Sequence, residues 1–249
     1  LSIVGSEMLP QLPFECLPLE GQPLGERFAL DHWPGVAFVL ARAEAPAGRG
    51  PLRLALFGTV RRDAGEAGLG STYVAPLLEG YDRPIVHLED RCRLADLTAL
   101  GATDVLVLMA HGERRRELVR PIVLRLHDGI FTCDDVARLP APRVVVLAAC
   151  NAALGPNRFG APLRADLGGA FLEHGAGCVA ASPFALRLEP TRRLLTTTLQ
   201  LLRAGVDPAE ALRRSRVKLA EATDGAQAAL DRWTTAALAV FGHGQRGLR

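Results

Sequence analysis

Short apolar runs alternate with segments of helical periodicity from about residue 50 onward, and this alternation constrains the fold more than any other feature. The apolar runs occupy residues 52–57, 84–88, 104–110, 143–150 and 177–182. Runs this short that are apolar on both faces are typical of parallel strands covered by helices above and below. The sequence therefore predicts an α/β fold in which helices flank a mostly parallel central sheet.

Helix signals fill the gaps between these runs. Apolar side chains repeat with helical spacing before Gly175 and again before Gly205, and glycine at such positions is typical of a helix C-terminus. Asp207 and Pro208 provide an N-cap and a first-turn proline for a further helix. A weaker helix is predicted over residues 71–80, because that segment contains an internal proline.

Two segments depart from the alternation. Residues 121–126 and 129–132 flank Asp128-Gly129, which is a strong hairpin signal, so we expect an inserted β-hairpin between the third and fourth core strands. Residues 233–241 are apolar and rich in alanine and threonine. They predict a final strand at the edge of the sheet.

The organisation along the chain indicates one domain. No internal repeat, low-complexity linker or charge block marks a boundary in the 249 residues, and this length is ample for one buried core. We predict a single domain over residues 1–249, in which residues 1–50 form a small N-terminal subsheet with a strand at 36–41. The chain begins with leucine rather than methionine, so we expect it to be a piece of a longer protein.

Composition excludes several classes of protein. A formal net charge of +2 and 49% hydrophobic residues indicate a globular protein and give no electrostatic signal for nucleic acid or a membrane surface. No apolar run reaches the roughly 18 residues that cross a bilayer, and no secretory signal is visible. Five scattered cysteines without a C-x-x-C pair fit neither a disulfide framework nor a zinc cluster. We therefore expect a reduced, cytoplasmic protein.

Motifs for common cofactors and nucleophiles do not occur in the sequence. The single lysine, Lys218, precedes leucine and so cannot complete a phosphate loop, and the glycine pair at 68–70 lacks the third glycine of a dinucleotide fingerprint. Neither the G-x-S-x-G motif of serine hydrolases nor the H-E-x-x-H motif of zinc peptidases is found. The six histidines are dispersed. The sequence therefore predicts no cofactor and no metal site.

His111 and Cys150 hold equivalent positions on consecutive predicted strands. His111 follows the third run directly, and Cys150 ends the fourth. If these strands are neighbours, they lie about 4.8 Å apart and both side chains reach one crevice at the carboxyl edge of the sheet. A histidine there can take the proton of a cysteine and leave a nucleophilic thiolate. The alternative is a buried structural thiol beside a His-Gly turn.

Gly112 adds a third element to this hypothesis. It follows His111 and has no side chain to obstruct a substrate. Its N–H, together with that of Cys150, is suited to bind the oxyanion of a tetrahedral intermediate. His127 and Cys133 are also close in sequence, but they belong to the inserted hairpin and its exit, where we expect structural or solvent-facing roles.

At these residues the chain resembles a known family. The segments VLMAHG at 107–112 and VVLAACN at 145–151 are similar to the His-Gly and Ala-Cys motifs of caspase-like cysteine peptidases, and more narrowly of CHAT domains, which are often appended to tetratricopeptide repeats. The order of motifs continues in LPQLPFE at 9–15, in the inserted hairpin, in FLEHGAGCVAAS at 171–182 and in a Trp-containing segment at 233–242. The resemblance thus spans nearly the whole chain.

The resemblance implies a caspase-like three-layer sandwich and endopeptidase activity. Carried over by motif, His111 is the general base and acid, Cys150 is the nucleophile, and the N–H groups of Gly112 and Cys150 form the oxyanion hole. Two positions depart from the family's pattern. Pro-Phe-Ala at 183–185 replaces a Trp-Pro pair in the groove wall, and Asn151 replaces a glutamate or another polar residue.

The resemblance also implies that the S1 pocket includes the residue two positions before the nucleophile. That residue is Ala148, and Ser182 at the end of the next strand is a second candidate for this pocket. A basic P1 side chain would find no carboxylate at Ala148, so we expect an apolar or small P1 residue. An acidic P1 residue would require an arginine in the pocket, and Arg114–Arg116 are the nearest in sequence.

These features predict a bacterial, cytoplasmic cysteine endopeptidase that cleaves a specific protein target by limited proteolysis. We expect control by an upstream sensor or a tetratricopeptide-repeat partner, with the glycine-containing loop 151–162 as the switch. No contact with nucleic acid or a membrane is expected. Two alternatives stay open: a catalytically idle caspase-like scaffold, and a cysteine transferase or acyl hydrolase that uses the same two residues.

Overall fold

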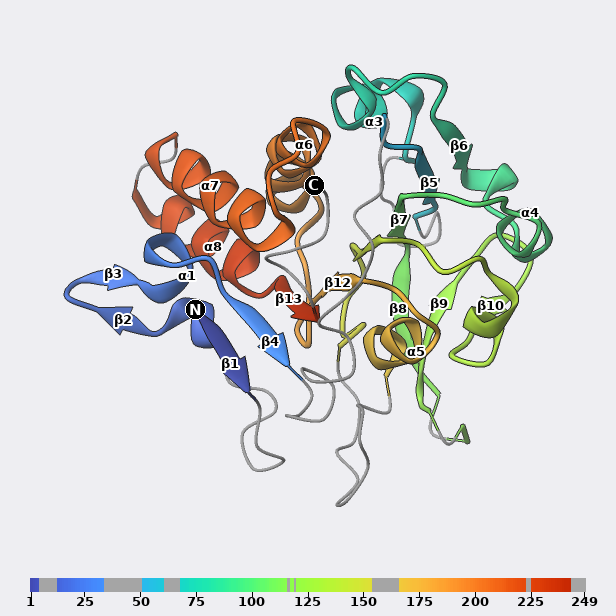
Figure 1. Ribbon diagram of the computed structural model, residues 1–249, viewed down its shortest axis with the longest axis horizontal. Helices are drawn as coiled ribbons and strands as arrows, with labels where there is room; N and C mark the ends of the chain where they lie inside the picture. Colours follow the sequence, from blue (N-terminus) through green and yellow to red (C-terminus); the bar gives the residue numbers. More distant parts are fainter. Residues whose placement is uncertain are drawn as a thin grey trace.

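The structure is a computed structural model that describes residues 1–4, 13–33, 51–60, 68–115, 117–118, 120–153, 166–222 and 225–242. Within these ranges the chain forms an eight-stranded sheet with helices on both faces, a three-stranded sheet and a two-stranded hairpin (Figure 1). The predicted strand at 36–41 lies outside the described residues. So do the first four residues of the LPQLPFE segment and most of the loop 151–162.

The eight-stranded sheet has the order β1-β4-β13-β12-β11-β7-β5-β6. All neighbouring pairs are parallel except β12 and β13, which run antiparallel. The strands in chain order are β1 (Ser2–Val4), β4 (Asp31–Trp33), β5 (Leu54–Gly58), β6 (Ile85–Leu88), β7 (Val105–Met109), β11 (Val144–Leu147), β12 (Cys178–Ala181) and β13 (Ala239–Gly242). The prediction of a mostly parallel sheet is therefore confirmed.

Helices connect most of these strands. In chain order they are α1 (Leu24–Arg27), α3 (Ser71–Leu78), α4 (Leu94–Thr98), α5 (Leu167–Glu173), α6 (Leu188–Arg203), α7 (Pro208–Glu221) and α8 (Gly225–Ala236), with 3₁₀ helices at Phe14–Cys16, Glu89–Arg91 and Asp135–Arg138. The predicted ends of α5 and α6 are confirmed, because Gly175 and Gly205 follow them with φ of +111° and +81°. Glycine adopts this conformation without strain.

Two apolar cores, one on each face of the sheet, divide the molecule into three layers. Side chains alternate along β7, so that Leu106 and Leu108 enter one core while Val105 and Val107 enter the other. Phe171 of α5 belongs to the first core, and apolar residues of α3, α6 and α7 belong to the second. β5, β7, β11 and β12 are buried along their whole length, which explains why their sequences are apolar on both faces.

A separate antiparallel sheet is inserted between β7 and β11. It consists of β8 (His111–Arg114), β9 (Ile122–Arg125) and β10 (Ile130–Phe131), with β9 in the middle. β9 and β10 are the predicted hairpin, which is confirmed. β8 was not predicted, and it places His111 and Gly112 in a strand rather than in a turn.

The prediction of an edge strand over residues 233–241 is wrong in two respects. Trp233 lies in α8, and β13 begins only at Ala239 and lies between β12 and β4. Threonine favours strands, but the hydroxyls of Thr234 and Thr235 donate to backbone carbonyls of the preceding helical turn and are satisfied inside the helix. The edge strands of the sheet are β1 and β6.

The described N-terminal strands join the main sheet. β1 pairs with β4, and β4 pairs with β13, so these strands of the N-terminal stretch 1–50 extend the main sheet of the domain. Of the described residues in that stretch, β2 (Pro18–Leu19) and β3 (Gln22–Pro23) alone form a hairpin of their own. The physical reason is that β13 would otherwise leave one row of backbone groups unpaired, and β4 covers it.

Candidate active site

The neighbouring strands β7 and β11 bring His111 and Cys150 to the same edge of the sheet. They are parallel neighbours, in register with Leu108 opposite Leu147. His111 begins β8 two residues after β7 ends, and Cys150 lies three residues after the end of β11. The strand arrangement that a shared crevice requires is therefore present.

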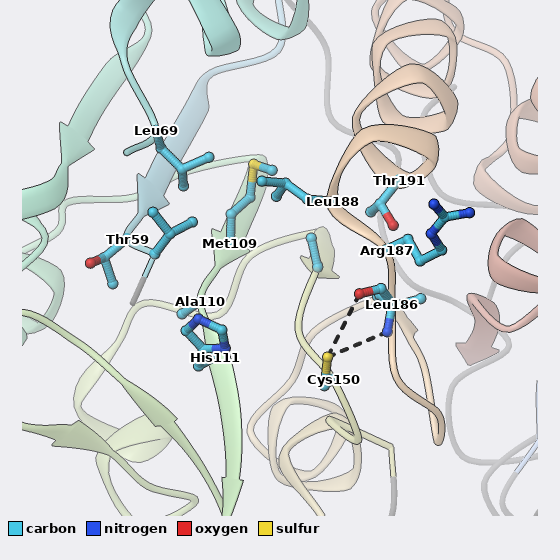
Figure 2. A pocket seen from close by; sticks show the side chains of 12 residues that line it. Thr59, Leu69, Met109, Ala110, His111, Cys150, Leu186, Arg187, Leu188 and Thr191 are labelled. Carbon is cyan, nitrogen blue, oxygen red and sulfur yellow. Dashed lines mark hydrogen bonds between the residues drawn. The ribbon is translucent and has the colours of Figure 1, made fainter. Parts of the chain in front are cut away.

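His111 and Cys150 line one cavity of about 370 Å³ (Figure 2). The other lining residues are Thr59, Val60, Leu69, Met109, Ala110, Ala148, Leu186, Arg187, Leu188 and Thr191. Figure 2 shows the His111 and Cys150 side chains on opposite sides of the same end of the cavity. Most of the wall is apolar, and among the described lining residues Arg187 alone carries a permanent charge.

Gly112 lies directly against the backbone of Cys150. A Cβ atom at position 112 would stand 1.7 Å from the carbonyl oxygen of Cys150, so no residue with a side chain fits without moving the backbone. Arg115 N–H donates to the Pro121 carbonyl oxygen at 2.6 Å in the same ladder. Hydrogen-bonded and non-hydrogen-bonded pairs alternate along an antiparallel ladder. Arg115 is in a hydrogen-bonded pair, so Gly112, three residues earlier, is in a non-hydrogen-bonded pair and its N–H is directed away from β9. That N–H is thus not used in pairing with the neighbouring strand.

The segment after β12 holds the turn that carries Cys150. Leu186 N–H donates to the Cys150 Sγ at 3.3 Å, and the same sulfur lies 3.8 Å from the Leu186 carbonyl oxygen (dashed lines in Figure 2). The N–H of Asn151 donates to the carbonyl oxygen of Phe184 at 3.1 Å. The backbone of Leu186 therefore fixes the position of the Cys150 sulfur in the cavity.

The four other cysteines lie outside this cavity. Burial raises the pKa of the Cys92, Cys133 and Cys178 thiols to about 12 and that of the Cys16 thiol to about 11. These thiols are therefore protonated at neutral pH and poor nucleophiles. Cys150 is therefore the cysteine whose position in the cavity suits a nucleophile.

The two residues expected in the S1 pocket have different surroundings. Ala148 lines the cavity together with Cys150. Ser182 does not line it, because its side chain is fully buried and its hydroxyl both donates to the Phe184 carbonyl and accepts from the Phe184 N–H, at 3.0 Å each. The assignment of Ser182 to S1 is therefore corrected: its hydroxyl stabilises the turn after β12.

Arg187 is the charged lining residue that the sequence analysis missed. Arg114 and Arg115, the described members of the expected arginine cluster, do not line the cavity, and Arg116 lies outside the described residues. A signal for Arg187 was present in the sequence. It follows the predicted strand at 177–182 by five residues, at the same edge of the sheet as Cys150.

The described residues offer few other groups for chemistry. Within the described ranges, no group of three or more histidine, cysteine, aspartate or glutamate side chains could hold a metal ion. None of the described helices is both long and apolar enough to cross a membrane. His127 is exposed and Cys133 is buried, as expected for the inserted hairpin and its exit.

Asn151 turns the chain directly after Cys150. Its φ is +59°, a left-handed conformation that asparagine and glycine tolerate and β-branched residues do not. Asn151→Val is therefore expected to lower the free energy of unfolding by about 1–2 kcal/mol and to displace Cys150, whereas Asn151→Gly should preserve both. Thermal unfolding and the rate of Cys150 alkylation measure the two effects. Equal results for the two variants would contradict this role of Asn151.

Two solved structures share this fold. The complex of the Porphyromonas gingivalis RgpB pro- and mature domains superposes with a TM-score of 0.58 at 12% identity, covering 88% of this chain and 56% of that one. The crystal structure of the Arg-specific cysteine proteinase gingipain R (RGPB) gives a TM-score of 0.54 at 13% identity, covering 88% and 55%. The chain thus spans a little over half the length of these structures. No curated protein matches its sequence.

The three-layer arrangement, shared with gingipain R, places the chain in the class of caspase-like α/β folds. Within this class the CHAT domain model matches residues 1–243. The chain therefore belongs to the CHAT domain family, and the resemblance inferred from the motifs is confirmed.

Proposed function

We propose that this domain is a cysteine endopeptidase in which Cys150 is the nucleophile and His111 is the general base and acid. The observation that carries the proposal is that both residues line one cavity at the carboxyl ends of neighbouring parallel strands. Cys150 is also the one cysteine in that lining. The backbone of Gly112, packed against Cys150, adds an N–H group beside the nucleophile.

The reaction then proceeds as acyl transfer. His111 accepts the proton of the Cys150 thiol, and the thiolate attacks the carbonyl carbon of the scissile peptide bond. The N–H groups of Gly112 and Cys150 bind the oxyanion of the tetrahedral intermediate. His111 returns the proton to the leaving amine, which departs and leaves a thioester on Cys150. Water, deprotonated by His111, hydrolyses the thioester and restores the thiol.

We propose that the enzyme does not cleave after basic residues. Gingipain R is named for its arginine specificity, and burying a guanidinium requires a carboxylate partner. Ala148, two positions before the nucleophile, has no charge, and the described residues that line the cavity include no aspartate or glutamate. A basic P1 side chain would therefore bury its charge beside Arg187 without compensation.

We propose further that the substrate is a specific protein, cut by limited proteolysis in a bacterial cytoplasm under control of a sensor or a tetratricopeptide-repeat partner. The contacts of Cys150 support control at the loop that follows it. Its sulfur accepts a hydrogen bond from the Leu186 N–H, and the N–H of Asn151 donates a hydrogen bond to the Phe184 carbonyl. A partner that displaces the segment carrying Phe184 and Leu186 therefore also moves the nucleophile.

The test is digestion of a proteome-derived peptide mixture, read by mass spectrometry, with the full chain and its variants. Cys150→Ala and His111→Ala are each expected to lower cleavage by at least about 10³-fold, since removing a group that acts directly in the reaction has effects of that size. Cys16→Ala is the matched control. It removes a thiol outside the cavity and should leave cleavage within about twofold of the unsubstituted chain.

A second measurement separates the alternatives. An electrophilic peptide probe should label Cys150, and labelling should depend on His111. Labelling together with cleavage supports the endopeptidase, and labelling with transfer of an acyl group to a small nucleophile instead of peptide cleavage supports the transferase. Absence of both labelling and cleavage would contradict the proposal and favour the idle scaffold.

A further inference from the structure

We propose that the start of α6 forms an S1 subsite that selects an acidic P1 residue, with Arg187 and Thr191 as its specificity-determining residues. This inference rests on the proposed peptidase function. Arg187, Leu188 and Thr191 all line the cavity that contains Cys150 (Figure 2). They come from the residue before α6 and from its first turn. The positive end of the helix dipole therefore faces the cavity, and this favours a negatively charged ligand.

Thr191 provides an independent indication of a ligand. Its side chain is only 4% exposed, and its Oγ1 has no hydrogen-bond partner within the described part of the chain. Thr196 and Thr198 of the same helix behave differently, because their hydroxyls donate to carbonyls four residues earlier at 2.9 and 2.8 Å. A buried hydroxyl without a partner is unfavourable. A bound carboxylate would accept the hydrogen bond that the Thr191 hydroxyl lacks.

The charges around this end of the cavity favour an anion. The Arg187 side chain is 47% exposed, and its Nη1 lies 3.7 Å from Asp231, a distance too long for a direct hydrogen bond. Arg193 approaches the same carboxylate at 3.9 Å. Glu189 is bound by two hydrogen bonds from Arg192. Asp231 therefore makes no direct hydrogen bond to the Arg187 Nη1, and this nitrogen is available as a donor to a second carboxylate.

The apolar wall is suited to the remainder of such a side chain. Val60, Leu69 and Met109 line the cavity together with the small side chain of Ala148, so the methylene groups of aspartate or glutamate contact apolar atoms while the carboxylate meets Arg187 and Thr191. An apolar P1 residue would cover the Thr191 hydroxyl without bonding it. A basic residue would be repelled by Arg187. Both comparisons favour an acidic residue.

The test uses fluorogenic peptides that differ only at P1, with Asp, Glu, Asn, Gln, Leu or Arg at that position. The unsubstituted chain should cleave the acidic peptides with a kcat/KM at least tenfold above that of their amide counterparts. Arg187→Gln is expected to lower this acid-to-amide ratio about 10- to 100-fold, since a lost charge-assisted hydrogen bond has an effect of this size. Thr191→Val should lower it about fivefold. Arg187→Glu should shift the preference towards P1 arginine.

Arg193→Gln is the matched control, because Arg193 also approaches Asp231 but does not line the cavity. It should leave the acid-to-amide ratio within about twofold. Faster cleavage after leucine than after acidic residues, or a ratio that Arg187→Gln leaves unchanged, would overturn the S1 proposal while the peptidase stands. If no peptide in the series is cleaved, labelling of Cys150 by acyloxymethyl ketone probes with Asp or Leu at P1 is compared instead. Preferential labelling of Cys150 by the Asp probe supports S1, preference for Leu overturns it, and no labelling by either contradicts the peptidase function itself.

Discussion

Gly112→Ala is expected to abolish the proposed peptidase activity while the rest of the chain keeps its fold. The added Cβ atom would stand 1.7 Å from the Cys150 carbonyl oxygen and 2.8 Å from its carbonyl carbon. Neither atom belongs to a flexible side chain, so the strand β8 or the turn at Cys150 must shift by an ångström or more. Misplacement of a catalytic group by that distance lowers rates by about 10²-fold, and loss of an oxyanion donor lowers them by a further 10²- to 10³-fold.

The substitution should also lower the free energy of unfolding by about 3 kcal/mol, at the upper end of overpacking effects. Peptide cleavage and thermal unfolding measure the two changes. Gly129→Ala in the β9–β10 turn is the matched control, because a Cβ atom there meets nothing within 4 Å. Native stability and native cleavage in Gly112→Ala would refute the close contact between β8 and the Cys150 turn.

The central sheet and the pair His111 and Cys150 could be anticipated from the sequence for one physical reason. β7 and β11 are buried on both faces, so their apolar runs are unbroken and easy to delimit. The carboxyl end of such a run is where polar groups can reach a crevice. A histidine and a cysteine at those ends are therefore visible in the sequence, whichever elements surround them.

Other features depend on contacts that a linear pattern does not encode. Trp233 lies in a helix because α8 packs against α6 and α7, and the run of alanine and threonine around it fits a strand equally well. Ser182 directly follows a core strand, and its position in the sequence therefore resembles that of His111. Its hydroxyl is nevertheless hydrogen-bonded to the backbone of Phe184 and does not reach the cavity. Arg187 lines the cavity only because the segment after β12 folds back over Cys150. Each of these outcomes is decided by tertiary packing.

A buried charged cluster joins the N-terminal residues to the C-terminal helices. Glu15 is 1% exposed and Arg216 of α7 is 4% exposed, and the Glu15 Oε1 lies 2.8 Å from the Nε2 of His32. Arg216 donates to the carbonyl oxygens of Leu238 at 2.5 Å and Thr235 at 3.3 Å. Burial alone would raise the pKa of Glu15, but attraction to His32, its hydrogen bond and attraction to Arg216 together lower it.

Glu15→Gln is therefore expected to destabilise the fold strongly, because it removes the carboxylate that most strongly compensates the buried Arg216 guanidinium. Removing one partner of a buried charged pair typically costs about 3–5 kcal/mol, and the carbonyl partners of Arg216 place this case near the lower limit. Denaturant unfolding measures the loss. Glu20→Gln is the matched control, since Glu20 pairs with Arg27 at the surface with 73% of its side chain exposed, and exposed pairs contribute less than about 1 kcal/mol.

The dependence on pH distinguishes a charge effect from a packing effect in the Glu15 variant. Because the folded-state pKa of Glu15 is lowered, its charge stabilises the fold above the ordinary carboxyl pKa of about 4.3, and this contribution is lost as the pH falls through the folded-state value. The difference in unfolding free energy between the unsubstituted chain and Glu15→Gln should accordingly be full at pH 7 and shrink below pH 4, where protonated glutamate and glutamine are alike. A difference that stays constant from pH 7 to pH 3 would show that Glu15 stabilises the N-terminal segment by its shape alone.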